Sequence, residues 1–161
     1  MTIKDSFAAA DWGRVVAAPM LAGIAVTAAE PSGLFGALRE SMAAAGALRT
    51  GTSDDNPLIR EVIAAYDTAE GRDLARGVLK AQAAGKKPAE IVEAAVDELK
   101  SVAAVVTGTA PDQAAGFKAW LNTIAGRVAE AGTEGGFLGF GGEKVSAHEK
   151  ATLERIATAI A

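Results

Sequence analysis

The residues that could do chemistry in this chain are few and far apart. His148 is the only histidine, and the chain has no cysteine, which excludes disulfides, thiol catalysis and thiolate metal sites. A serine–histidine pair would need an acid and a serine brought close by the fold, and nothing in the sequence indicates such a set. His148 falls in the first turn of an expected helix, where a side chain usually faces water. We therefore interpret it as a surface residue and expect that the protein is not an enzyme.

Two groups of polar residues could hold a hard divalent cation. Glu90, Glu93 and Asp97 recur at i, i+3 and i+7, which places them on one helix face. The same positions form the polar side of an amphipathic helix and are followed by Lys100, so a solvated face explains them better. The run Asp54-Asp55-Asn56 lacks the alternating ligand spacing of a calcium loop and is more simply a turn and a helix cap. We predict no metal site from either group.

The segment from Gly135 to Gly142 combines glycines with large apolar side chains. A glycine-rich loop can cradle a phosphate, but here Glu143 stands before Lys144 and no strand precedes the glycines. Neither the P-loop pattern nor the dinucleotide pattern is met. The large apolar side chains must find a groove, in this chain or in a partner, and both a plug over the chain's own core and a docking loop fit the sequence. The residues of this candidate interaction loop are Gly136, Phe137, Leu138, Gly139 and Phe140.

Length and composition indicate the class of protein. The 161 residues fit a single domain, 1–161, and can bury one sizeable core. Half of the residues are hydrophobic but only 5% are aromatic, so alanine supplies much of the apolar content and favours closely packed helices. A net charge of −4 argues against nucleic acid and gives no electrostatic help at an anionic membrane. We expect a cytoplasmic protein that binds protein partners or itself, with no cofactor and no nucleic-acid or membrane partner.

Glycines and prolines divide the chain into expected helices. The first runs over residues 11–29 with Pro19 inside it, and we interpret its apolar part as a buried core helix because it is short for a membrane span. Further helices are expected over 32–48, after Asn56 with Pro57 at the first position, over 70–84, from Pro88 to Gly108, over 109–132, and from Ser146. No stretch alternates as a half-buried strand does. The prediction is an all-α fold, a single compact bundle of about six helices.

Three of these helices have clear apolar stripes. The helix after Pro88 has Ile91, Val92, Ala95, Val96, Leu99, Val102, Ala103 and Val106. The next helix has Phe117, Trp120, Leu121, Ile124 and Val128. The last helix has Leu153, Ile156, Ala157 and Ile160, and Ser146 with Glu149 forms the pattern of a capping box at its start.

Two segments share the pattern small-Gly-apolar-apolar-Gly. They are Ser32 to Gly36 and Gly135 to Gly139, and each follows an alanine-rich helix and precedes another helix. A duplicated unit of helix, glycine turn and helix explains this pattern, and so does chance similarity in a chain rich in alanine and glycine. Both explanations stay open at the level of the sequence.

The stretch from Lys144 to Lys150, with Leu153 and Ile156 after it, resembles the helix start of tellurite-resistance TerB-like domains. Residues 22–30 are similar to the helix that precedes the first acidic turn of that family. The resemblance implies a small helical bundle associated with stress response that binds metal through acidic residues. The Asp-Gly turns of the family are replaced here by Pro31-Ser32-Gly33 and Gly141-Gly142. This leaves Glu30 and Glu40, or Glu143 and Glu149, as the acids near the two turns.

Two hypotheses of function follow. The first is a non-catalytic protein that binds another protein or a second copy of itself through Gly136–Phe140. The alternative is a stress-response protein of TerB-like type that binds a metal ion or small ligand through Glu30 and Glu40.

Overall fold

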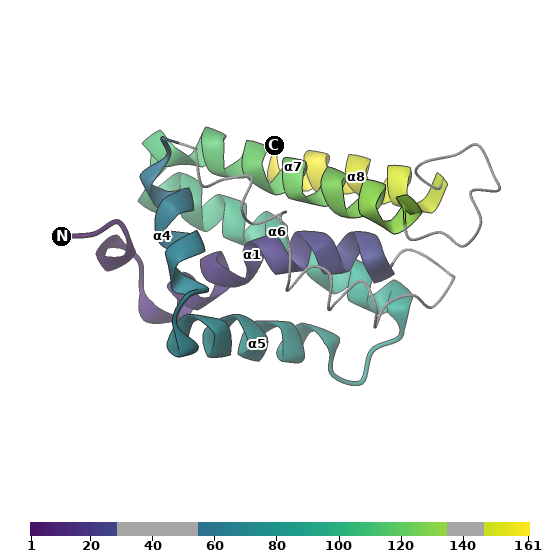
Figure 1. The fold of residues 1–161 in the computed structure, drawn as a ribbon, viewed down its shortest axis with the longest axis horizontal. Coiled ribbons are helices and arrows are strands. Elements are labelled where there is room, and N and C mark those ends of the chain that lie inside the picture. The colour runs from purple at the N-terminus through teal and green to yellow at the C-terminus, as the bar shows by residue number, and fades with distance from the viewer. Residues whose placement is uncertain (29–54, 135–146) are drawn as a thin grey trace.

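The computed structural model describes residues 1–28, 55–134 and 147–161. In these ranges the chain forms a short 3-10 turn and six α-helices, with no strand (Figure 1). The all-α prediction is confirmed, whereas the helix expected over 32–48 lies outside the described residues. The elements are the 3-10 turn Lys4–Ser6, α1 (Ala9–Ala28), α4 (Pro57–Ala65), α5 (Ala69–Ala83), α6 (Pro88–Thr109), α7 (Pro111–Glu134) and α8 (Ala147–Ile160).

Helix α1 forms the centre of the bundle. It contacts all five other α-helices, and it is buried around most of its circumference. Ala17, Ala18 and Ala22 are completely buried, and these small side chains let the neighbouring helices approach closely. A helix that is apolar on every side needs neighbours on every side. The interpretation of this segment as a core helix agrees with the structure as far as Ala28.

Helices α6 and α7 bury the stripes that their sequences indicate. The buried residues of α6 are the eight that helical spacing predicts, and its polar side with Glu90, Glu93 and Asp97 is exposed. All five apolar residues of the predicted stripe on α7 are buried as well. Two of them, Phe117 and Trp120, pack their rings with centroids 5.8 Å apart, within the range of favourable aromatic pairs.

The buried face of α8 differs from the predicted one. Ala157 is exposed, while Glu149 and Thr152 are buried together with Ile156 and Ile160. This face is rotated by roughly 45° from the predicted stripe, because the packing against α6 and α7 decides which side of the helix turns inward. The prediction that Ala157 is part of the apolar stripe is therefore wrong. Ser146 lies outside the described residues, so the capping box stays a prediction.

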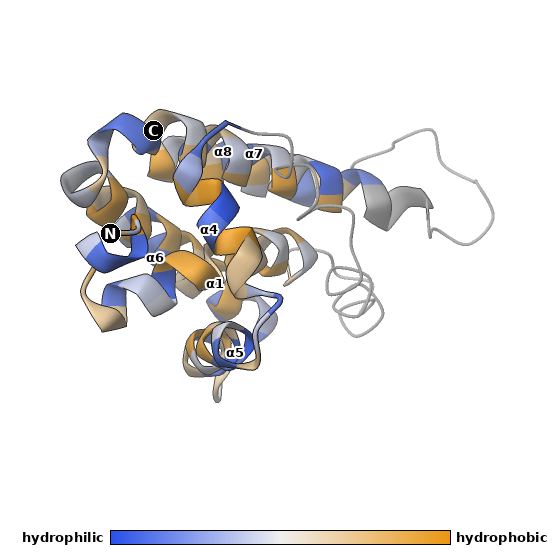
Figure 2. Ribbon diagram, turned by 60° about the vertical axis from the view of Figure 1, so that its left-hand side comes forward, coloured by the Kyte–Doolittle hydropathy of each residue, from blue (hydrophilic) through white to orange (hydrophobic). Residues whose placement is uncertain are grey.

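Helices α4 and α5 are joined by a tight turn. Asn56 caps α4 as predicted, because its side chain accepts a hydrogen bond from the Ile59 N–H at 3.2 Å. Thr68 caps α5 by accepting from the Gly71 N–H at 3.0 Å. Helix α5 then runs along α1 at one edge of the bundle, on the side away from α7 and α8 (Figures 1 and 2). After it, Gly85 has a φ of +68°, which only glycine adopts easily.

Candidate functional site

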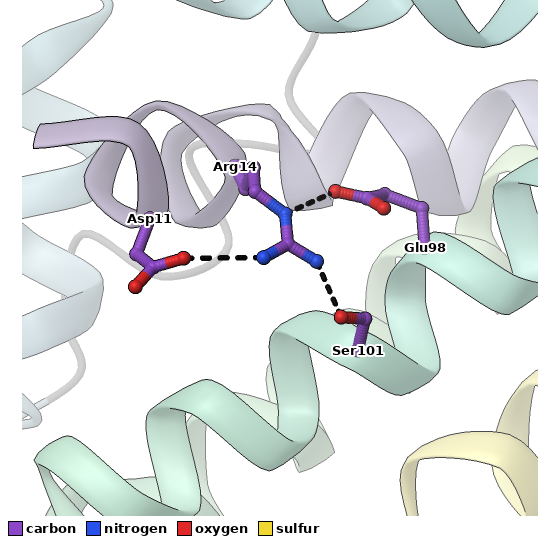
Figure 3. Close-up of polar contacts among 4 residues, drawn as sticks. All are labelled: Asp11, Arg14, Glu98 and Ser101. Atoms are coloured by element: carbon purple, nitrogen blue, oxygen red, sulfur yellow. Dashed lines mark hydrogen bonds and ion pairs between the residues drawn. The ribbon is translucent and has the colours of Figure 1, made fainter. Parts of the chain in front are cut away.

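Four polar residues meet between α1 and α6 and form what we call the Arg14 cluster. It consists of Asp11 and Arg14 from α1, and Glu98 and Ser101 from α6 (Figure 3). The Nε of Arg14 donates to Glu98 Oε1 at 2.5 Å, and one terminal nitrogen donates to Asp11 Oδ1 at 3.1 Å. The other terminal nitrogen donates to the Ser101 hydroxyl. Each nitrogen of the guanidinium thus donates one hydrogen bond, and two of the three acceptors belong to α6.

The electrostatics of this cluster suit a cross-link between helices. The side chain of Glu98 is 14% exposed and that of Arg14 is 27% exposed, so water reaches both groups only in part. The hydrogen bond from Arg14 to Glu98 raises the pKa of Arg14 above its ordinary value, and partial burial opposes this rise. Two carboxylates already compensate the one positive charge, which leaves little attraction for an anionic ligand. The cluster stabilises the contact between α1 and α6.

A second polar contact supports α1 next to its proline. Pro19 has no N–H, so the carbonyl group of Val15 loses its usual helical donor, and the helix is weakened at this turn. The Tyr66 hydroxyl, at the end of α4, donates to the neighbouring carbonyl oxygen of Val16 at 2.5 Å. Burial raises the pKa of Tyr66 above its ordinary value, so the hydroxyl keeps its proton and remains a donor.

Most of the site residues predicted from sequence lie outside the described residues. This applies to the candidate interaction loop, Gly136–Phe140, and to Glu30 and Glu40. His148 is described and is exposed in the first turn of α8, as expected. Within the described ranges, no three His, Asp or Glu side chains come together as a group that could hold a metal ion.

The ends of the described helices show where the candidate interaction loop joins the bundle. Helices α7 and α8 lie side by side and run in opposite directions, and the chain between them is attached at one end of the bundle (Figure 1). Helix α1 ends at the same end (Figure 1). The two glycine-containing segments, Ser32–Gly36 and Gly135–Gly139, therefore both follow helices that finish at this end, since only a few residues separate each from its helix.

The Arg14 cluster was not predictable from the sequence. Residues 14 and 98 are 84 positions apart, and no local pattern connects them. One local signal was available, because Arg14 is the only basic residue of a helix that is otherwise almost free of charge. A charged residue in a central apolar helix needs a partner, but its sequence position does not say on which helix that partner lies.

Helix α1 is also the one described helix that is long and apolar enough to cross a membrane by length and composition. In the bundle, 67% of the apolar window is buried. The core helix of a soluble protein passes the same criterion, so this result alone assigns no location to the chain.

Comparison of the chain with protein-family models, with curated proteins and with solved structures gave no match. The resemblance to TerB-like domains therefore remains a prediction from the residues named above.

Proposed function

We propose that this protein works by binding another polypeptide, a second copy of itself or a different protein, and that it does so without catalysis. The proposed contact is the candidate interaction loop. The observation that carries the proposal is its sequence, in which Phe137, Leu138 and Phe140 alternate with glycines. Glycines let a backbone follow a partner surface closely, and aromatic anchors supply much of the binding energy in known interfaces.

The attachment of this loop supports the proposal. Antiparallel neighbours in helical bundles are usually joined by about two to eight residues. Twelve residues, 135–146, separate the described ends of α7 and α8, and the candidate interaction loop lies among them.

The remainder of the described surface offers little that could replace it. Among the described residues, Met1 is the only large apolar side chain that is fully exposed. The Arg14 cluster is occupied by its own hydrogen bonds. These observations favour the loop over the described helical surface as the apolar contact.

The test compares the parent chain with Phe137→Ser/Phe140→Ser by sedimentation velocity over a range of concentrations. We expect the parent to associate and the variant to remain monomeric, with unchanged helical circular dichroism and unchanged melting temperature. Ala157→Ser is the control, because it adds a hydroxyl to the exposed side of α8 without removing an apolar anchor.

The same experiment distinguishes a loop that contacts a partner from a loop that packs on the chain's own core. If the two phenylalanines cover the chain's own core, the double variant loses stability, because large apolar groups leave their buried positions. A variant that keeps both its stability and the association state of the parent would refute a role of the loop as an interface.

A further inference from the structure

Basic residues are concentrated on and after α5. Between Asp73 and Glu90 the chain has four basic residues and no acidic one, although the chain as a whole has a net charge of −4. The four are Arg76, Lys80, Lys86 and Lys87, and all of them are exposed. The net charge of this segment is therefore positive, whereas the net charge of the whole protein is negative.

The helical geometry aligns part of this charge. Arg72, Arg76 and Lys80 stand at i, i+4 and i+8 on α5, so they form one row, about 12 Å long, along one side of the helix. We call these three residues the basic row. Asp73 stands beside the basic row, within reach of Arg76, and Glu70 lies further around the exposed side of the helix.

The surroundings leave the basic row open to solvent. Arg72 donates to the carbonyl oxygen of Tyr66 at 2.8 Å, and Arg76 pairs with Asp73 at 3.2 Å in a contact in which both side chains are about 70% exposed. An exposed pair of this kind contributes little and exchanges its partner easily. In the part of the chain that the structure describes, Lys80 has no side-chain partner.

The charged groups on the elements around α5 are engaged elsewhere. Glu61 of α4 accepts hydrogen bonds from the backbone N–H groups of Ile3 and Lys4. Asp11 and Glu98 belong to the Arg14 cluster, and Glu93 of α6 pairs with Arg155 of α8 at 2.8 Å. Glu90, in the first turn of α6, accepts from the backbone N–H of Lys87. None of these described acids makes an ion pair with the basic row.

Large apolar side chains lie beside the basic residues. Leu74, Val78 and Leu79 pack against the core but remain partly exposed, and Leu79 projects close to the side of the basic row. Helix α5 lies along the edge of the bundle with its length open to the outside (Figures 1 and 2). The apolar face of α5 is turned toward α1, so the basic residues on its exposed side are the part that an anionic surface would attract.

We propose that α5 and the residues 84–87 after it dock the protein on an anionic lipid bilayer. A bilayer fits this surface better than a folded partner does, because mobile headgroups can align with a straight row of cations without a matching shape. The expectation of no membrane partner was based on the net charge of the whole chain. Charges more than about 10 Å from the contact are largely screened, so the local charge governs the approach to a surface. Each basic residue near an anionic surface strengthens binding about fivefold.

The test is cosedimentation of the full chain with vesicles of phosphatidylcholine alone or with about 30% phosphatidylserine. We expect binding to the anionic vesicles only, and loss of that binding in high salt. The variant Arg76→Gln/Lys80→Gln/Lys87→Gln should bind roughly a hundredfold more weakly.

The matched control is Lys100→Gln/Arg127→Gln/Lys150→Gln, which removes the same charge from exposed positions on α6, α7 and α8. It should bind nearly as the parent does. Equal losses in both variants, or no binding of the parent to anionic vesicles, would overturn the proposal.

Two further measurements distinguish binding to lipid from binding to other polyanions and from the proposed function of the candidate interaction loop. Binding of the parent to a short DNA duplex or to poly-glutamate, but not to the vesicles, would also overturn it. The Phe137→Ser/Phe140→Ser variant should bind the vesicles as the parent does, so the failure of one proposal leaves the other intact.

Discussion

Replacing Gly71 by alanine should destabilise the protein strongly, although alanine normally stabilises a helix. A Cβ atom at Gly71 would clash with the carbonyl oxygen of Ala65 and would lie 2.7 Å from its carbonyl carbon. Both are backbone atoms of the last residue of α4, so the clash cannot be relieved by rotating a side chain. The N–H of Gly71 also donates to the cap residue Thr68.

Gly77, on the same helix, is the matched control. It is exposed, and a Cβ atom there would meet nothing within 4 Å. Gly77→Ala should therefore raise the free energy of unfolding by about 0.5–1 kcal/mol, which is the usual gain in helix propensity. Gly71→Ala should lower it by about 2–3 kcal/mol, because overpacking costs about 1–3 kcal/mol and disturbance of the cap adds to that cost.

Urea denaturation followed by circular dichroism measures both free energies of unfolding. The two variants should differ by about 3 kcal/mol, or by roughly 10 °C in melting temperature. The opposite signs are the decisive feature, because both substitutions add the same methyl group to α5. Two variants of equal stability would show that α4 and α5 do not approach each other as described, and the placement of the basic row would then be wrong as well.

Three further predictions concern the polar contacts and the acidic residues. Glu98→Gln should lower the free energy of unfolding by about 1–2 kcal/mol in urea denaturation. Asp73→Asn, which breaks an exposed pair, should change it by less than about 0.5 kcal/mol. Equal effects of the two substitutions would contradict the role of the Arg14 cluster. Burial raises the pKa of Tyr66, so the protonated side chain contributes fully to stability below its ordinary pKa of 10.0. This contribution is lost as the pH rises above that value. Tyrosinate absorbance should therefore appear together with the loss of helical circular dichroism. Since Tyr66 is the only tyrosine, ionisation while the helices remain intact would refute this. Calorimetry with calcium, magnesium, manganese and zinc should show no saturable heat, and a saturable heat that is lost in Glu30→Gln/Glu40→Gln would favour the metal-binding alternative instead.

The features that could be predicted from the sequence are those that depend on a single helix. The buried residues of α6 follow from its apolar spacing, and the caps at Asn56 and Gly85 follow from residue types that favour one backbone geometry. The central position of α1 is consistent with its lack of a polar side.

Features that depend on two helices were not predictable from sequence. The inward face of α8 depends on how α6 and α7 are oriented, and a rotation of roughly 45° places Glu149 and Thr152 inside and Ala157 outside. The partners of Arg14 on α6, Glu98 and Ser101, are more than 80 positions away in the chain. The candidate interaction loop was proposed from its sequence, and it lies outside the described residues.

The proposed function rests on Phe137 and Phe140 making an apolar contact with another polypeptide. Hydrogen–deuterium exchange of residues 136–140, followed by mass spectrometry at low and high protein concentration and with candidate partners, tests this most directly. We expect exchange there to slow when the complex forms, while exchange in α6 stays unchanged. Equally rapid exchange of these residues in every assembly that the protein forms would contradict the proposal.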